Sequence, residues 1–308
     1  MNGRPVLLRV LLAVLAIALV SSGIAGCKAK PTTSDLDADN ESGIPTATSS
    51  SETSELPAED GSFTETSTPS KPMFVKVYFT RGDKLGVSTR QIPATRAVAT
   101  AAMRELLKGP SADEKAYGLG TTVPDGTKLR GVTITDRVAT VDLTGTFESG
   151  GGSLSMTMRL TQVVYTLTQF KTVTSVRFSL DGKPVSVFGG EGIMLDKPLT
   201  RLSYEDVLPA ILVESPTPMQ TATSAVRVAG NANVFEAVFI AEIRDASGVT
   251  LAKEQVMATS GTGTRGTFDA TFPFATPETQ MGSLVVYEVS AKDGSHINVV
   301  TIPLKLVK

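Results

Sequence analysis

Cys27 is the residue whose type and setting most clearly indicate chemistry. It is the only cysteine among the 308 residues, and the small residues Ala25 and Gly26 precede it directly. A cysteine that gives its thiol to a thioether needs small neighbours on its N-terminal side, because the modifying and cleaving enzymes take them into a narrow pocket. We therefore predict cleavage between Gly26 and Cys27 and lipidation of the Cys27 sulfur. Two or more acyl chains there would hold the protein on a bilayer, whereas a single chain binds reversibly.

The residues before Cys27 have the three parts of a secretory signal peptide. Arg4 and Arg9 give a positive start, residues 10–20 are apolar, and small residues lead into the cleavage site. The apolar run is too short for a comfortable membrane span. With Cys27 the pattern resembles the bacterial lipobox, so residues 1–26 are predicted to be a lipoprotein signal peptide, and the mature chain to be anchored by lipid on the extracytoplasmic face of the cell membrane. The alternative is a buried structural cysteine in an uncleaved hydrophobic helix.

The amino-acid composition argues against several kinds of site. A single cysteine cannot form an internal disulfide, and with His296 as the single histidine the chain lacks the material for a Cys/His zinc site, so we expect no metal or other cofactor. Tryptophan is absent and aromatic residues are 6% of the chain, which argues against recognition of sugars or nucleic acids by stacking. A hydrophobic content of 41% supplies material for about two domains of common size.

Residues 27–72 form an acidic segment rich in Ser, Thr and Pro. Its nine acidic side chains outnumber its three lysines, so the segment carries a net charge of about −6 and the body after it is near neutral. Such a composition cannot bury enough apolar surface to offset the entropy of ordering. We predict a disordered tether with a root-mean-square reach of roughly 35–40 Å. The near-neutral body is expected to bind no nucleic acid.

Residues 73–195 show strand and helix patterns in alternation. An apolar strand is predicted over residues 74–79, and an alanine-rich helix over residues 94–108, where Gly and Pro follow as a stop signal. Alternating apolar residues then predict a hairpin over residues 132–143, with a turn at residues 136–137.

A second helix and a further strand follow in the same part of the chain. Ser153 is placed to cap a helix whose apolar residues recur at helical spacing up to Phe170. Residues 176–180 predict a strand, and Asp181 with Gly182 forms the favoured pair for a tight turn. These elements together predict a small α+β domain with both helices on one face of a mixed sheet.

Residues 209–308 show strand patterns throughout, after a connector that bears prolines. Six or seven short strands with frequent turns are typical of a β-sandwich. The expected strands cover residues 226–228, 235–243, 249–251, 268–274, 284–290 and 297–306.

Short motifs in both predicted domains are similar to those of bacterial spore proteins. In the first domain they are residues 106–110, 123–127, 138–143, 164–170 and 181–185. They resemble the GerMN domain of sporulation and germination lipoproteins, and the likeness covers about residues 73–188. In the second domain they are residues 215–218, 228–232, 234–237, 266–268 and 288–294. These resemble the immunoglobulin-like domain of bacterial spore germination proteins.

The two resemblances imply a non-catalytic, membrane-anchored scaffold or interaction module of the cell envelope, acting in sporulation, spore germination or related envelope assembly. GerMN domains resemble ring-building modules of sporulation channels, so envelope, spore-coat or channel proteins are the implied partners. Peptidoglycan and a second copy of the chain are left open as partners. The main alternative is an envelope protein that binds peptidoglycan or another glycan, and a wall hydrolase is less favoured.

A wall hydrolase would need an acid and a base paired in one cleft. The carboxylates are instead scattered over predicted helix, strand and turn positions, which favours surface and turn-forming roles, so no catalytic residue is predicted. His296 is expected at the surface, and residues 150–152 are expected to be a flexible break, because the Lys-Ser/Thr pair of a phosphate-binding loop does not follow them. The carboxylates considered are Glu105, Asp142, Glu148, Asp181, Glu236 and Asp293.

Overall fold

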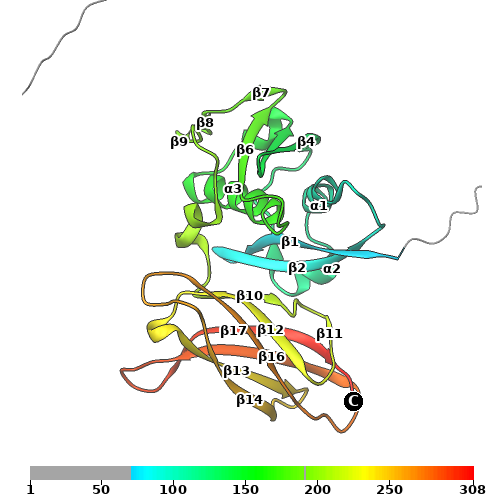
Figure 1. The fold of residues 1–308 in the computed structure, drawn as a ribbon, viewed down its shortest axis with the longest axis vertical. Coiled ribbons are helices and arrows are strands. Elements are labelled where there is room, and N and C mark those ends of the chain that lie inside the picture. Colours follow the sequence, from blue (N-terminus) through cyan, green and yellow to red (C-terminus); the bar gives the residue numbers. More distant parts are fainter. Residues whose placement is uncertain (1–70, 191) are drawn as a thin grey trace, which may run out of the picture. The chain divides into compact units, whose positions relative to one another are not determined.

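The computed structural model describes residues 71–190 and 192–308, which lie within one compact unit of the chain. They form an α+β domain followed by a β-sandwich, each built around its own large hydrophobic core (Figure 1). The signal peptide, Cys27 and the predicted tether up to residue 70 lie outside the described residues, so cleavage between Gly26 and Cys27 and lipidation stay predictions. The domain limits predicted above, residues 73–195 and 209–308, likewise stay predictions.

The first sheet of the α+β domain is built on a long apolar strand. The strand predicted over residues 74–79 is confirmed as β1, and β1 lies between its two partners in the order β2-β1-β3. Val77, Tyr78 and Phe79 are successive residues of β1 that are completely buried, so both faces of this sheet are covered. The strands are β1 (Met73–Arg81), β2 (Lys84–Ile92) and β3 (Leu119–Gly120).

The second sheet of this domain is mixed, as expected. Its order is β4-β5-β6-β7, and β5 and β6 run parallel while the other pairs are antiparallel. The turn between β6 and β7 is the predicted Asp181 and Gly182 pair, and both residues adopt positive φ angles. A small hairpin of β8 and β9 follows. The strands are β4 (Leu129–Thr135), β5 (Val138–Leu143), β6 (Ser175–Leu180), β7 (Lys183–Pro184), β8 (Val187–Phe188) and β9 (Ile193–Met194).

A single sheet had been expected, and this was wrong: the domain has two sheets, and most of α3 is buried all round between its neighbours. Every residue of α3 from Met158 to its end is buried, including Thr161 and Thr166. A helix buried all round needs neighbours on more than one side. The helix packs against β1 of the first sheet and β6 of the second (Figure 1). The helical segments are α1 (Val98–Leu107), α2 (Ala112–Ala116), the 3-10 turn η1 (Gly145–Glu148) and α3 (Ser153–Leu167).

Two helix boundaries differ from the predictions. The alanine-rich helix begins at Val98 instead of residue 94, and its cap residue Ala97 offers no side-chain acceptor. In α3 the cap position belongs to Gly152, so Ser153 is the first helical residue and not the cap. By contrast, α2 has a full capping box, in which the Ser111 side chain accepts from the Glu114 backbone and the Glu114 side chain accepts from the Ser111 backbone.

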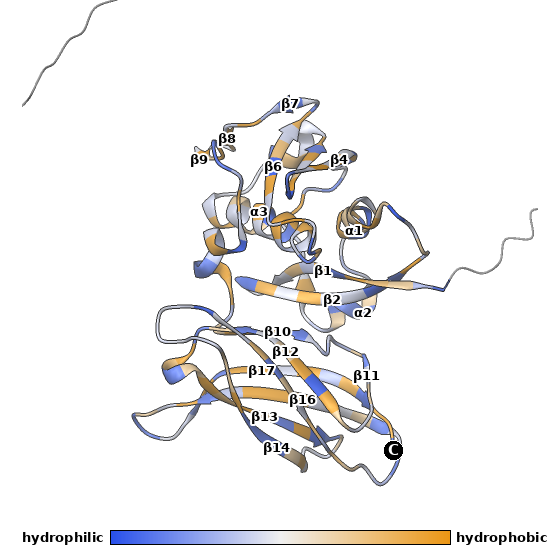
Figure 2. Cartoon of the chain, in the orientation of Figure 1, coloured by the Kyte–Doolittle hydropathy of each residue, from blue (hydrophilic) through white to orange (hydrophobic). Residues whose placement is uncertain are grey.

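The second domain is a sandwich of two sheets with orders β10-β12-β15 and β11-β17-β16-β13-β14. Figure 2 shows orange apolar positions along β13, β16 and β17, whereas the edge strand β14 has a run of three polar residues, Lys253, Glu254 and Gln255, at its centre. The expected strand 235–243 is confirmed only from Val238. Residues Phe235–Ala237 form a 3-10 turn instead, in which Glu236 and Ala237 have positive φ angles. The strands are β10 (Ile211–Ser215), β11 (Thr221–Ala222), β12 (Val226–Ala232), β13 (Val238–Asp245), β14 (Thr250–Met257), β15 (Gly266–Phe272), β16 (Gln280–Val289) and β17 (His296–Leu306).

Candidate functional site

A cluster of charged and aromatic side chains joins the two domains. Glu214 is on β10, the first strand of the sandwich, and its Oε1 accepts from the Tyr78 hydroxyl of β1 and from Arg201 Nη1, both at 2.6 Å. Arg201 Nη2 also donates to the Tyr78 hydroxyl at 3.2 Å. Lys76 Nζ lies 3.4 Å from Glu214 Oε2, and the Arg201 guanidinium lies 4.4 Å from the ring centre of Tyr165 on α3. We name Lys76, Tyr78, Tyr165, Arg201 and Glu214 the junction cluster.

The electrostatics of the junction cluster favour its charged form. Burial acts to raise the pKa of Glu214, but the charges of Arg201 and Lys76 and the hydrogen bonds from Tyr78 and Arg201 hold that pKa below its ordinary value. Burial and the adjacent Glu214 carboxylate raise the pKa of Tyr78 well above its ordinary value, and burial raises the pKa of Tyr165 to about 12. Both phenols therefore stay protonated at neutral pH, and Tyr78 remains a hydrogen-bond donor.

The connector between the domains is held to the sandwich by Arg265. This side chain is 9% exposed, and its Nε donates to Glu205 Oε2 at 2.8 Å. Its Nη2 donates to the Pro209 carbonyl at 2.9 Å, and its Nη1 to the Asn231 side chain at the same distance. Asn233 donates to the other oxygen of Glu205 at 2.9 Å. Glu205 belongs to the 3-10 segment η2 (Arg201–Val207), so one short segment carries ties to both domains.

Strand β2 also contacts the second domain or the connector directly. The hydroxyl of Thr217 donates to Thr89 of β2 at 2.9 Å. Lys84, at the start of β2, donates to the carbonyl of Asp206 at 2.8 Å. The junction is therefore made of several independent polar contacts.

The sequence offered only indirect signs of this site. Glu214 follows the apolar residues of β10, and Arg201 and Glu205 stand in the connector that had been noted only for its prolines. An acidic residue beside a buried strand needs a partner, but the partner Tyr78 is 136 positions away. No local pattern pairs residues at that distance.

The carboxylates considered for catalysis are spread over the structure and serve local roles. Glu105 accepts from Arg90 and from Lys108. Glu148 accepts from the Gly189 backbone at 2.6 Å, and Asp181 from the Gly145 backbone at 3.0 Å. Each of these groups is engaged in an ion pair or a backbone hydrogen bond. The geometry thus provides no pairing of a free acid with a free base among them.

The remaining three acids also have local or surface roles, and two of them accept from backbone groups. Asp142 accepts from Gly182 N at 2.9 Å and also pairs with Arg130 at 3.1 Å. Asp293 accepts from Ser295 N at 3.0 Å within the turn between β16 and β17. Glu236 is exposed, as expected, although it lies in a turn and not in a strand.

His296 is exposed and covers a polar cluster on the outer face of the sandwich. Its ring stacks on Tyr287 with the ring centres 3.7 Å apart. The Tyr287 hydroxyl donates at 2.6 Å to Glu242, which is 4% exposed and is also bound by Arg244 and Lys253. Every acceptor here already has a cationic or hydroxyl donor, so the cluster is a satisfied structural network.

Arg159 explains the role of the glycine run at residues 150–152. This arginine of α3 is 2% exposed and donates to three backbone carbonyls: Thr122 at 3.0 Å, Phe147 at 2.5 Å and Gly150 at 3.0 Å. Arg159 therefore binds the carbonyl of Gly150 and holds the start of the glycine run in place. This disagrees with the predicted flexible break.

We expect Arg159→Met to lower the free energy of unfolding by about 3 kcal/mol, because three backbone carbonyls, of which that of Phe147 is buried, would lose their donor. Urea unfolding monitored by circular dichroism measures the change. Arg177→Met on the exposed face of β6 is the control, and it should stay within about 0.5 kcal/mol of the wild type. Equal stability of the two variants would contradict this role for Arg159.

The described residues show neither a cluster of metal ligands nor a helix able to cross a membrane. No group of three His, Cys, Asp or Glu side chains is gathered there as a metal ion would require. No helix in residues 71–190 and 192–308 combines the length and the hydropathy that crossing a bilayer requires.

Comparison with known proteins assigns both domains. Residues 76–186 match the family described as sporulation and spore germination, and residues 210–295 match the immunoglobulin-like domain of bacterial spore germination. Among solved structures, the chain is similar to the first GerMN domain of the sporulation protein GerM from Bacillus subtilis, with 19% identity and a TM-score of 0.37 over 42% of this chain and 98% of that chain. The tandem GerMN domains of the same protein share 14% identity and a TM-score of 0.37, over 65% of this chain and 61% of theirs. Among curated proteins no relative matches.

Proposed function

Starting from a chain that carries a GerMN-type sporulation and spore germination domain followed by the immunoglobulin-like domain of bacterial spore germination, we propose that this protein is a non-catalytic scaffold of the cell envelope. It is anchored to the membrane by a lipid on Cys27 and acts in sporulation, spore germination or related envelope assembly. Its partners are envelope, spore-coat or channel proteins.

The observation that supports a scaffold is the junction between the domains. Tyr78 of the first domain, Arg201 of the connector and Glu214 of the second domain share one hydrogen-bonded cluster. Two domains tied in this way present their surfaces together, as a protein that organises partners requires. Neither family description names a reaction, and the candidate acids are engaged in structural contacts.

The proposed anchor is tested by Cys27→Ala. Because only a thioether at this sulfur would hold the chain, the variant should leave the membrane fraction and no longer enter the detergent phase on Triton X-114 partitioning. Ser42→Ala, in the predicted tether, is the control and should fractionate as the wild type does. A Cys27→Ala protein that stays in the detergent phase would rule out the lipid anchor.

Incubation with purified peptidoglycan separates the scaffold from its alternatives. The purified mature chain should neither release soluble fragments nor sediment with the insoluble wall material. Release of fragments would identify an enzyme. Sedimentation would favour a wall-binding protein.

A further inference from the structure

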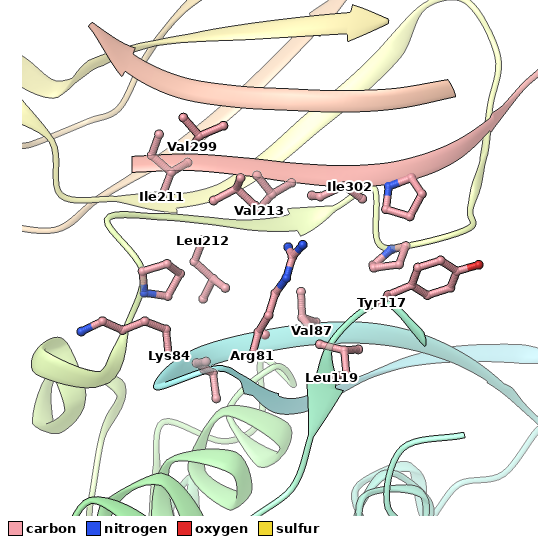
Figure 3. Close-up of a pocket in the computed structure, with 16 residues that line it drawn as sticks. Arg81, Lys84, Val87, Tyr117, Leu119, Ile211, Leu212, Val213, Val299 and Ile302 are labelled. Atoms are coloured by element: carbon pink, nitrogen blue, oxygen red, sulfur yellow. The ribbon is translucent and has the colours of Figure 1, made fainter. Parts of the chain in front are cut away.

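A cavity of about 310 Å³ lies between β2 of the first domain and the strands β10 and β17 of the second (Figure 3). Its walls are mostly aliphatic, and its volume lies at the lower end of the range found for small-molecule sites in other proteins. Leu85, Leu119, Leu212 and Ile302 of these walls are each less than 5% exposed, so they are fixed by the packing around them. Figure 3 shows Arg81 reaching from the first domain toward β17, in the middle of this space.

The charges around the cavity are of one sign. Arg81 and Lys84 are the charged residues among the described side chains that line it, and no carboxylate lines it. Each cation uses one donor on a backbone carbonyl, since Arg81 Nη2 donates to Thr301 at 3.1 Å and Lys84 Nζ to Asp206 at 2.8 Å. A guanidinium has five N–H donors and an ammonium three, so both cations keep donors for an anion.

Apart from the hydroxyl of Tyr117, the rest of the cavity offers few side-chain partners for a polar ligand. Three of the lining residues are prolines, which have no backbone N–H group: Pro209, Pro218 and Pro303. The carbonyl of Pro303 already accepts from Met219 N at 2.8 Å, and the carbonyl of Thr301 is taken by Arg81. A peptide placed here would have to pair its amide groups with the backbone of the edge strands β2 and β10, or else bury them without partners. An aliphatic body has no such groups.

We propose that this cavity binds a monocarboxylate with an aliphatic body, a ligand of the fatty-acid class. The carboxylate contacts Arg81 in the middle of the cavity, and the hydrocarbon lies against Leu85, Leu119 and Ile302. The ligand touches both domains at once, so its binding strengthens the junction. This site goes beyond the scaffold function and does not depend on it.

Isothermal titration calorimetry of the purified mature chain with sodium decanoate tests the proposal. The wild type should bind decanoate with a negative heat-capacity change and should bind the uncharged analogue decanol at least about tenfold more weakly. Arg81→Ala should weaken decanoate binding by about tenfold, because it removes a charge-assisted hydrogen bond. Arg177→Ala, on β6 and outside the cavity, should leave the affinity unchanged.

Two further measurements keep the test decisive if Arg81→Ala disturbs folding. Val299 lines the cavity and is 53% exposed, so Val299→Glu places a carboxylate at the rim without disturbing a core; it should weaken decanoate binding by about tenfold. Decanoate should also raise the melting temperature of the wild type and not that of the Val299→Glu variant. Absence of decanoate binding, equal binding of decanol, or undiminished affinity in these variants would overturn the proposal. Tighter binding of a short peptide carboxylate than of decanoate would overturn the aliphatic ligand class.

Discussion

Replacing Glu214 with Ala is expected to lower the free energy of unfolding by about 3 kcal/mol at pH 7. The change would leave Arg201 and Lys76 without their carboxylate in a largely buried cluster, and an uncompensated buried charge is strongly destabilising. Urea unfolding followed by fluorescence measures the difference. Asp269→Ala is the matched control, since it removes an ion pair of the same short distance whose two partners are more than half exposed. That variant should unfold like the wild type.

The contribution of Glu214 should depend on pH in a known direction. Its pKa in the folded protein lies below the ordinary value, so the stabilisation is fully present above the unfolded-state pKa and is lost as the pH falls through the folded pKa. The stability difference between the wild type and Glu214→Gln should therefore be largest near neutral pH and shrink on acidification. A difference that grew as the pH fell would show that the junction cluster is not held by the charge of Glu214.

Gly230→Ala is the second change with a large expected effect. Gly230 lies on β12 between β10 and β15, and a Cβ atom there would stand 2.0 Å from the Leu212 carbonyl oxygen and 2.9 Å from the ring of Phe268. The backbone of β10 would have to move away from β12. We expect a loss of about 3 kcal/mol in the free energy of unfolding, and a weaker junction because β10 carries Glu214.

The matched control for Gly230→Ala is Gly131→Ala on β4. An added Cβ there would meet nothing within 4 Å, so the variant should be as stable as the wild type or gain up to about 1 kcal/mol. Thermal unfolding of both variants, monitored by circular dichroism, measures the contrast. Similar melting temperatures for the two would contradict the close approach of β10 and β12 at Gly230.

The sequence predicted the local elements well where the periodicity was strong. The structure confirms the strand at β1, the hairpin of β4 and β5, and the turn at Asp181 and Gly182. The sequence could predict each of them because each depends on residues that are close in the chain. The family resemblances of both domains are confirmed by the matches over residues 76–186 and 210–295. The fold class, α+β followed by a β-sandwich, follows from them.

What the sequence could not predict depends on contacts between distant residues. The separation of β1 from the mixed sheet goes with the burial of α3 from Met158 to its end, which the helical spacing alone did not reveal. The turn at Glu236 interrupts an alternating apolar pattern because of backbone angles that a pattern of side chains does not encode. The junction cluster unites residues from β1, the connector and β10, and no short motif contains them.

The two domains should unfold as one unit, and differential scanning calorimetry of the purified mature protein measures whether they do. Because Glu214, Arg201 and Tyr78 tie the domains together and Arg265 ties the connector to the sandwich, we expect a single cooperative unfolding transition. Its calorimetric and van't Hoff enthalpies should agree. Two separate transitions, each unaffected by Glu214→Ala, would show that the two domains unfold independently and that the junction cluster does not couple them.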